Sequence, residues 1–222
     1  MRGERASDER FLPMHGFVLA GGKSSRMGVD KATLEFRGRP MVEIAVEKLR
    51  GFCAEVGICG NREDLNRFAP VVLEERVDAG PAAGVEAGLK AATQEWVLFV
   101  PVDVPLIPAE VLRRWAEVSL EMSASGGFDA FHLYAGRDQP AFCILRRTCS
   151  VRFSEVLHEG ERRLSQLLHK ATQGFQWSLD MNDLYPTAHP NVDAVDRWFM
   201  NINTPEDLAV AEAFAEANPL QK

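Results

Sequence analysis

The chain has 222 residues, of which 46% are hydrophobic and 26% charged, a composition typical of a soluble globular protein. This length suits one domain with a sizeable core. The formal net charge of −7, without a basic cluster, argues against a protein that binds nucleic acid by neutralising many phosphates. No apolar run is long enough to span a bilayer, and the N-terminus lacks the apolar stretch of a secretory signal. We therefore expect a cytoplasmic protein that binds neither membranes nor nucleic acid.

Residues 1–13 are charged and aperiodic, and they predict a flexible N-terminal extension before a single domain over residues 14–222. The cysteines have no CxxC spacing, so we expect buried reduced thiols rather than disulfides or zinc ligands. The four are Cys53, Cys59, Cys143 and Cys149.

In the first half of the chain, short apolar runs alternate with segments of helical periodicity. The expected elements are a strand over 16–20, a helix over 39–49 with Pro40 in its first turn, strands over 56–60 and 71–75, a helix over 80–92, a strand over 96–100 and a helix over 109–121. This alternation predicts a single-domain, Rossmann-like α/β fold with a mostly parallel mixed sheet and helices on both faces. Ligands of such sheets bind beyond the carboxyl ends of the strands.

The second half is less regular. Its expected elements are strands over 130–134 and 140–145, helices over 150–158 and 162–169, a last strand over 199–203, and a final helix capped by Thr204 with Pro205 at its first position and Asp207 near N3. Residues 176–197 have no clear period, and we expect a surface excursion there.

The segment LAGGKSSRMGVDK, from Leu19 to Lys31, directly follows the first expected strand. The adjacent glycines Gly21 and Gly22 can present backbone N–H groups to a ligand, and Arg26 and Lys31 add charges that can meet phosphate oxygens. The spacing is that of neither a P-loop nor a dinucleotide-binding GxGxxG motif. A glycine-rich surface loop is the alternative, but a long aperiodic loop after the first buried strand favours phosphate binding.

Asp103 follows the strongest apolar strand and lies between Pro101 and Pro105. A carboxylate held at this edge of the sheet suits Mg²⁺, which takes one or two carboxylates plus substrate phosphates. The alternative is a turn or capping aspartate before the following helix. Two asparagines, Asn201 and Asn203, lie at the end of the last expected strand, where Asn203 can offer an amide oxygen to the metal or a donor to a phosphate.

LAGGKSSRMGVDK, VDVP and GPAAGVEAGL resemble the nucleotide-binding signature, the metal-binding strand end and the intervening segment of the nucleotidyltransferase superfamily. RDQPAFCIL, HEGERRLSQLL and FMNINTPEDLA narrow the resemblance to the molybdenum cofactor guanylyltransferases, from about Gly16 to about Ala215. The resemblance implies a magnesium-dependent enzyme that moves GMP from GTP to the phosphate of molybdenum-molybdopterin and releases pyrophosphate.

The resemblance also implies roles for single residues. It implies nucleotide contacts from Leu19, Ala20, Gly21, Gly22, Asn61 and Glu75, catalytic contacts with the triphosphate from Arg26 and Lys31, magnesium ligation by Asp103 with help from Asn203, and acceptor contacts from Arg162, Arg163, Asn201 and Asn203. The chain departs from the family at Glu75, where an aspartate is usual, and before Val29, where relatives often have two glycines.

The sequence is also compatible with other functions. The same chemistry can serve a cytidylyltransferase for the same pterin or a sugar-phosphate nucleotidyltransferase. A nucleotide-binding regulator without turnover is the alternative of a different class. The expected partners are GTP and molybdopterin as substrates, with transient contacts to molybdenum-insertion or molybdoenzyme-maturation proteins.

Overall fold

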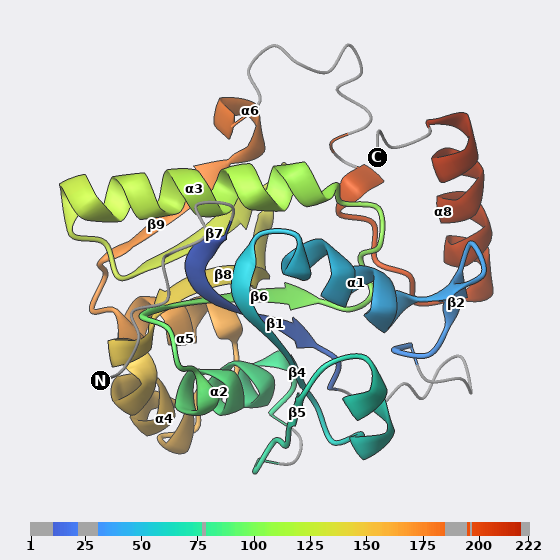
Figure 1. The fold of residues 1–222 in the computed structure, drawn as a ribbon. Helices are drawn as coiled ribbons and strands as arrows, with labels where there is room; N and C mark the ends of the chain where they lie inside the picture. The colour runs from blue at the N-terminus through green and yellow to red at the C-terminus, as the bar shows by residue number, and fades with distance from the viewer. Residues whose placement is uncertain (1–10, 22–30, 77–78, 185–194, 196, 219–222) are drawn as a thin grey trace, which may run out of the picture.

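The computed structural model, which describes residues 11–21, 31–76, 79–184, 195 and 197–218, is built around a seven-stranded sheet. Figure 1 shows this sheet in the centre of the molecule. The strand order is β5-β4-β1-β6-β8-β7-β9. The strands are β1 Leu12–Leu19, β4 Cys53–Cys59, β5 Val71–Val72, β6 Trp96–Pro101, β7 Ala130–Tyr134, β8 Asp138–Arg146 and β9 Gln176–Asp180. Six strands run in one direction and β8 runs against them. This confirms the predicted mostly parallel mixed sheet.

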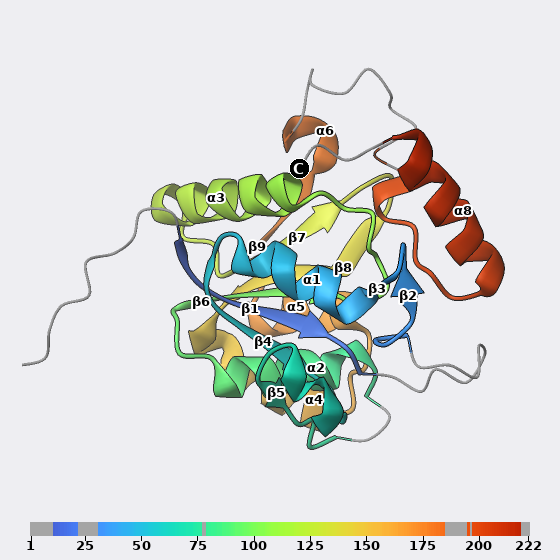
Figure 2. The ribbon, with the colours of Figure 1, turned by 45° about the vertical axis from the view of Figure 1, so that its right-hand side comes forward.

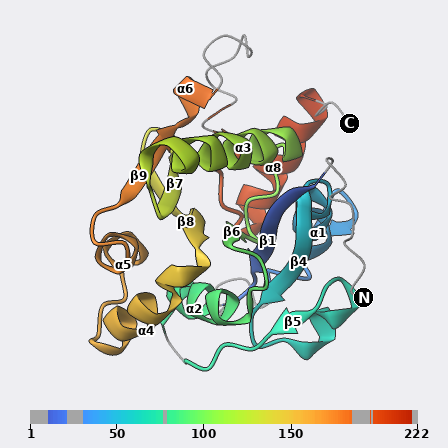
Figure 3. The same ribbon diagram turned by 60° about the vertical axis from the view of Figure 1, so that its left-hand side comes forward.

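Helices cover both faces of the sheet. Their bounds are α1 Met41–Arg50, α2 Pro81–Ala91, α3 Ala109–Gly126, α4 Ser150–His158, α5 Leu164–Ala171, α6 Met181–Leu184 and α8 Pro205–Ala217, with 3-10 helices η1 Glu63–Arg67 and η2 Arg147–Cys149. α1 and α3 lie on one face, and α2, α4 and α5 pack together on the other (Figure 3). The predicted α/β class is therefore confirmed.

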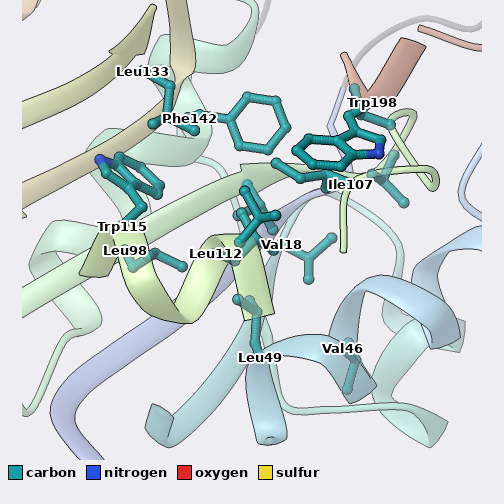
Figure 4. Close-up of a cluster of buried hydrophobic side chains, with 14 of the residues drawn as sticks. Val18, Val46, Leu49, Leu98, Ile107, Leu112, Trp115, Leu133, Phe142 and Trp198 are labelled. Carbon is teal, nitrogen blue, oxygen red and sulfur yellow. The ribbon is translucent and has the colours of Figure 1, made fainter. Parts of the chain in front are cut away.

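The alternation of side chains along the strands divides the interior into two cores. On β1, Val18 belongs with Leu49 and Trp115 to the core on the α1–α3 side (Figure 4), whereas the neighbouring Phe17 belongs with Phe153 to the core on the α2–α4–α5 side. Because both faces of the central strands are buried, these strands read as continuous apolar runs in the sequence.

Several elements begin at other residues than the sequence indicates, and two of them, β1 and α1, lie next to the site. β1 starts at Leu12, whose N–H donates to Phe52 O, so Leu12 and Pro13 belong to the strand. The helix expected from Arg39 starts at Met41, because Arg39–Pro40 forms the short strand β3, which pairs with β2 (Glu35–Phe36). The turn of this hairpin has positive φ at Arg37 and Gly38, and α8 lies beside it (Figure 2).

The C-terminal half holds two larger differences. The strand expected over 199–203 is wrong, because this segment is irregular: Ile202 N donates to Asp103 O at 2.9 Å, and its apolar side chain fills the core. Part of the expected surface excursion forms β9, which pairs in parallel with β7 at the sheet edge. The sequence pattern does not indicate β9, because this strand is mostly polar and Leu179 is the one buried residue among its five. Residues 185–194 and 196 lie outside the described part of the chain.

The predicted state of the cysteines is confirmed. All four are free and buried, and burial raises the pKa of their thiols above the ordinary value. They therefore pack as small apolar side chains rather than reactive groups. Among the described helices, none has the length and apolar character needed to cross a membrane.

Candidate active site

A cavity of about 500 Å³ lies beyond the carboxyl ends of β1 and β6 and is lined by Leu19 and Pro101 from these strands. β1 lies in the middle of the sheet, with β4 on one side and β6 on the other. The order of the strands along the chain therefore reverses direction at β1, and at such a switch point the loops that leave neighbouring strands in opposite directions form a crevice. The cavity is within the size range of small-molecule sites.

Three side chains from distant parts of the chain meet at this cavity. Lys31 Nζ donates to Asp103 Oδ2 at 2.9 Å and to Asn203 Oδ1 at 2.5 Å. The exposed fractions of the Lys31 and Asp103 side chains are 25% and 19%, so solvent screens the pair only in part. Lys31 and Asp103, which follow two different strands in the sequence, thus meet at the edge of the sheet where a ligand is expected to bind.

Backbone contacts and a helix cap hold these groups in place. Val102 N donates to Leu19 O, which ties the Asp103 loop to β1. Asp207 Oδ2 accepts from the N–H groups of Asn203 and Thr204, and Thr204 Oγ1 accepts from Asp207 N, so the predicted capping box of α8 is confirmed. The Asn203 N–H lowers the pKa of Asp207, which keeps the cap charged. Asn203 is therefore positioned by the helix start.

The oxygen atoms around the Lys31 ammonium fit a hard cation. A carboxylate oxygen and an amide oxygen already face one positive centre, and both are ligand types that Mg²⁺ accepts. Within the described ranges, no three His, Cys, Asp or Glu side chains gather into a metal site. A metal here therefore needs further oxygens, and substrate phosphates are the natural source.

Glu74 extends the cavity towards β4 and β5. Its carboxylate lies against the backbone of Gly21, where a Cβ would come within 2.1 Å of Oε1, and near Gly84 in α2. Asn61 Oδ1 accepts from Glu74 N at 2.9 Å and fixes the start of this segment. Burial raises the pKa of Glu74. The glycines of the first motif and of GPAAGVEAGL thus make room for an acidic side chain at the cavity.

The opposite side of the cavity is formed by a bulge in β8. His132 of β7 pairs with Cys143, but the next residue, Leu133, pairs with Gln139, so residues 140–142 of β8 have no partner on β7. All three line the cavity. Bulges of this kind redirect strand residues at functional sites.

The structure can be compared with the predicted site residue by residue. Lining the cavity are Leu19, Ala20, Gly21, Lys31, Asp103 and Asn201, while Asn203 contacts Lys31. Outside it are Asn61, Glu75, Arg162 and Arg163. Gly22 and Arg26 lie outside the described residues.

Among the residues outside the cavity, Glu75 binds Lys90 on the surface, and Arg162 donates to the carbonyl oxygens of Leu157 and Glu161. Sequence reasoning missed Glu74 and Arg137, which both line the cavity. Glu74 directly precedes Glu75, the residue that the family resemblance indicates. Arg137 belongs to the stretch RDQPAFCIL, which contributes to the resemblance but had no function assigned to its residues.

Lys48 supports the Asp103 loop from α1 and gives the stability a testable pH dependence. Its Nζ donates to Pro105 O at 2.5 Å, and burial lowers its pKa to about 7, against a smaller opposing effect of Glu110. Between pH 7 and the unfolded pKa near 10.5, the unfolded chain binds the extra proton, so the free energy of unfolding rises with pH, by at most about 1.4 kcal/mol per unit. We expect urea unfolding to show wild type more stable at pH 8.5 than at pH 7.

The matched variant is Lys48→Met, which should lose this gain. His15, whose pKa burial lowers, titrates below this window. Burial raises the pKa of the cysteine thiols only in the folded state, so their loss of protons in the unfolded chain towards pH 8.5 lowers the stability of wild type and variant alike. The difference between the two proteins therefore reports Lys48. An equal rise in stability in the variant would contradict the assignment to Lys48.

Solved structures share this architecture. The molybdopterin-guanine dinucleotide biosynthesis protein A of Archaeoglobus fulgidus superposes with a TM-score of 0.72 at 21% identity, over 91% of this chain and 99% of that one. A nucleotidyl transferase from Methanothermobacter thermautotroptrophicus superposes with a TM-score of 0.66 at 20% identity, over 92% of this chain and 99% of that one, so the chain shares the fold of these proteins.

The sequence comparisons give the family. The model of the MobA-like NTP transferase domain matches residues 16–174, and the chain belongs to this family. The molybdenum cofactor guanylyltransferase of Polynucleobacter asymbioticus is 32% identical over 209 residues, which cover 89% of this chain and 95% of the relative. The protein of the same description from Vibrio cholerae is 32% identical over 197 residues, which cover 86% and 88%.

Proposed function

We propose that the chain transfers GMP from GTP to the phosphate of molybdenum-molybdopterin, forming the guanine dinucleotide cofactor and releasing pyrophosphate. The observation that carries the proposal is the meeting of Lys31 and Asp103 in one cavity, with Asn203 bonded to the same lysine. The near full-length similarity to proteins described as molybdenum cofactor guanylyltransferases supports the choice of substrates.

We assign the guanine base to the Glu74 end of the cavity. The edge of guanine carries two neighbouring donors, N1–H and the N2 amino group, and a carboxylate can accept from both. The backbone of Leu19–Gly21 lies beside this carboxylate and lines the same end of the cavity, where a bound nucleotide would contact it. We therefore assign base selection to Glu74, while Asn61 positions it.

Glu74→Gln tests this assignment. The amide keeps the shape but turns a donor towards one guanine donor, so we expect kcat/KM for GTP to fall by about 10- to 100-fold, with little change for CTP. The measurement is kcat/KM for GTP and CTP side by side. Glu75→Gln is the matched control, because its side chain is 75% exposed and pairs with Lys90. Equal effects of the two variants would refute the role of Glu74.

The reaction needs positioning and charge neutralisation more than proton transfer. An acceptor phosphate oxygen attacks the α-phosphorus of GTP, and the bond to the β-phosphate bridging oxygen breaks, so pyrophosphate leaves with the electron pair. The attacking phosphate is already ionised and needs no general base. Lys31, and Arg26 by the family resemblance, stabilise the triphosphate and the leaving group. Asp103 and Asn203 would hold Mg²⁺, which supplies neutralisation of the phosphate charge.

A pyrophosphate-release assay with each of the four nucleotides tests the function, with and without magnesium, and with molybdopterin, a sugar phosphate or no acceptor. We expect release with GTP only when molybdopterin and magnesium are both present. A preference for CTP would point to the cytidylyltransferase, and release with a sugar phosphate to that class of transferase. Nucleotide binding without any release would point to a regulator and would overturn the proposal.

A further inference from the structure

We propose that Arg137 binds the phosphate of the acceptor, with Gln139 beside it, at the β8 end of the cavity. This proposal rests on the proposed function, because it concerns the second substrate of the same reaction. Nothing in the sequence motifs or in the comparisons assigns a role to either side chain.

The order of the strands separates two ends of the cavity. Glu74 lies at the β4–β5 end, Lys31 and Asp103 lie beyond β1 and β6, and Arg137 lies in the turn before β8. The Glu74 carboxylate lies against Gly21, which follows β1, and β1 and β8 are two strand spacings, about 10 Å, apart. A base held by Glu74 therefore lies away from the turn that carries Arg137, which leaves the β8 end of the cavity for the acceptor.

A second cavity widens this end. It has a volume of about 270 Å³ and is lined by Ala135, Gly136, Arg137, Gln139 and Phe199. Arg137 and Gln139 line both cavities and so stand where the two meet. A molecule that enters from the smaller cavity must pass these two side chains before it reaches Asp103.

Arg137 is available for a ligand. Its side chain is exposed, and in the part of the chain that the structure describes it has no carboxylate partner. The neighbouring Asp138 is turned to His132, with 3.2 Å between Oδ1 and Nε2. Lys31, the other described cation that lines the main cavity, is already bound to Asp103 and Asn203.

The hairpin fixes where the guanidinium can act. Ala135 N donates to Arg137 O at 3.0 Å, and Gly136 has φ +64°, so the turn is tight. The β8 bulge that follows brings residues 140–142 over the main cavity. The turn that carries Arg137 is thus built onto the wall of the site.

The chemistry of the acceptor calls for a cation at this place. Two anions must approach each other in a protein of formal net charge −7, so repulsion must be neutralised locally. A guanidinium can bind a phosphate through two parallel N–H···O bonds and so orient it for attack. The Gln139 amide adds a neutral donor and acceptor for the polar edge of a heterocycle.

The test compares Arg137→Ala, Arg137→Lys and Arg147→Ala with wild type. We expect Arg137→Ala to raise KM for molybdopterin by about 10- to 100-fold and to leave KM for GTP unchanged, with Arg137→Lys in between. Arg147 is exposed at the opposite end of β8, so Arg147→Ala should behave like wild type. An unchanged KM for molybdopterin in Arg137→Ala, or equal rises for both substrates, would overturn the proposal.

A binding measurement separates this proposal from the proposed function. Molybdopterin is titrated by calorimetry into protein loaded with α,β-methylene GTP, which cannot release pyrophosphate. Weaker binding to Arg137→Ala than to wild type supports the subsite even where the wild-type turnover assay fails. Equal binding to both proteins, or no binding to wild type, overturns it. Thermal unfolding of each variant shows whether the fold is retained.

Discussion

We expect Asp103→Ala to lower turnover by at least about a hundredfold while the fold stays intact. The side chain is the carboxylate that faces the common positive centre with Asn203, so its loss removes the strongest oxygen ligand from the proposed magnesium site. The fold should survive, because Asp103 is held through its backbone carbonyl, which accepts from Ile202 N and is unchanged in the variant.

The measurement is kcat for magnesium-dependent pyrophosphate release, with circular dichroism to monitor the fold. Asp64→Ala is the control, since this carboxylate is exposed and pairs only with Arg62 among the described residues. Near-normal kcat in Asp103→Ala would remove the aspartate from the chemistry.

Lys31→Ala should lower both kcat and kcat/KM, again by at least about a hundredfold. Its ammonium can stabilise the charge that moves onto the leaving pyrophosphate, which is largest in the transition state. It also bonds to both oxygen atoms of the proposed metal site, so alanine leaves Asp103 and Asn203 facing each other without a cation until the metal binds.

Steady-state kinetics with GTP and molybdopterin check this prediction, with Lys170→Ala as the control because this exposed lysine pairs with Glu161 far along the chain from the first motif. A rise in KM for GTP with unchanged kcat would mean that Lys31 only binds the ground state. That outcome would speak against its role in the transition state.

The fold could be predicted from the sequence where strands are buried on both faces. Runs such as Trp96–Pro101 are continuously apolar because helices cover both sides, so their pattern is strong. β9 could not be predicted because an edge strand has one neighbour and buries little; only Leu179 is fully buried. The strand expected over 199–203 was wrong for the opposite reason, because Phe199 and Ile202 are buried although the segment pairs with no strand.

The centre of the site could also be predicted, because Lys31 and Asp103 follow adjacent strands whose carboxyl ends share one edge. Its two ends could not. Glu74 and Glu75 are neighbours after a two-residue strand, and consecutive residues point in opposite directions, so a shift of one position exchanges cavity and solvent. The position of Arg137 at the cavity depends on a hairpin turn and on a bulge in β8, and the register of that bulge is known only from the structure.

A double-mutant cycle at Lys31 and Asp103 tests the shared site most directly. The quantity measured is kcat/KM for GTP with molybdopterin and magnesium, in wild type, both single alanine variants and the double variant. Because the two side chains contact each other and act on one bound nucleotide, the double variant should lose far less than the product of the two single losses. Losses that multiply would mean that the two residues act independently, and the shared site would have to be abandoned.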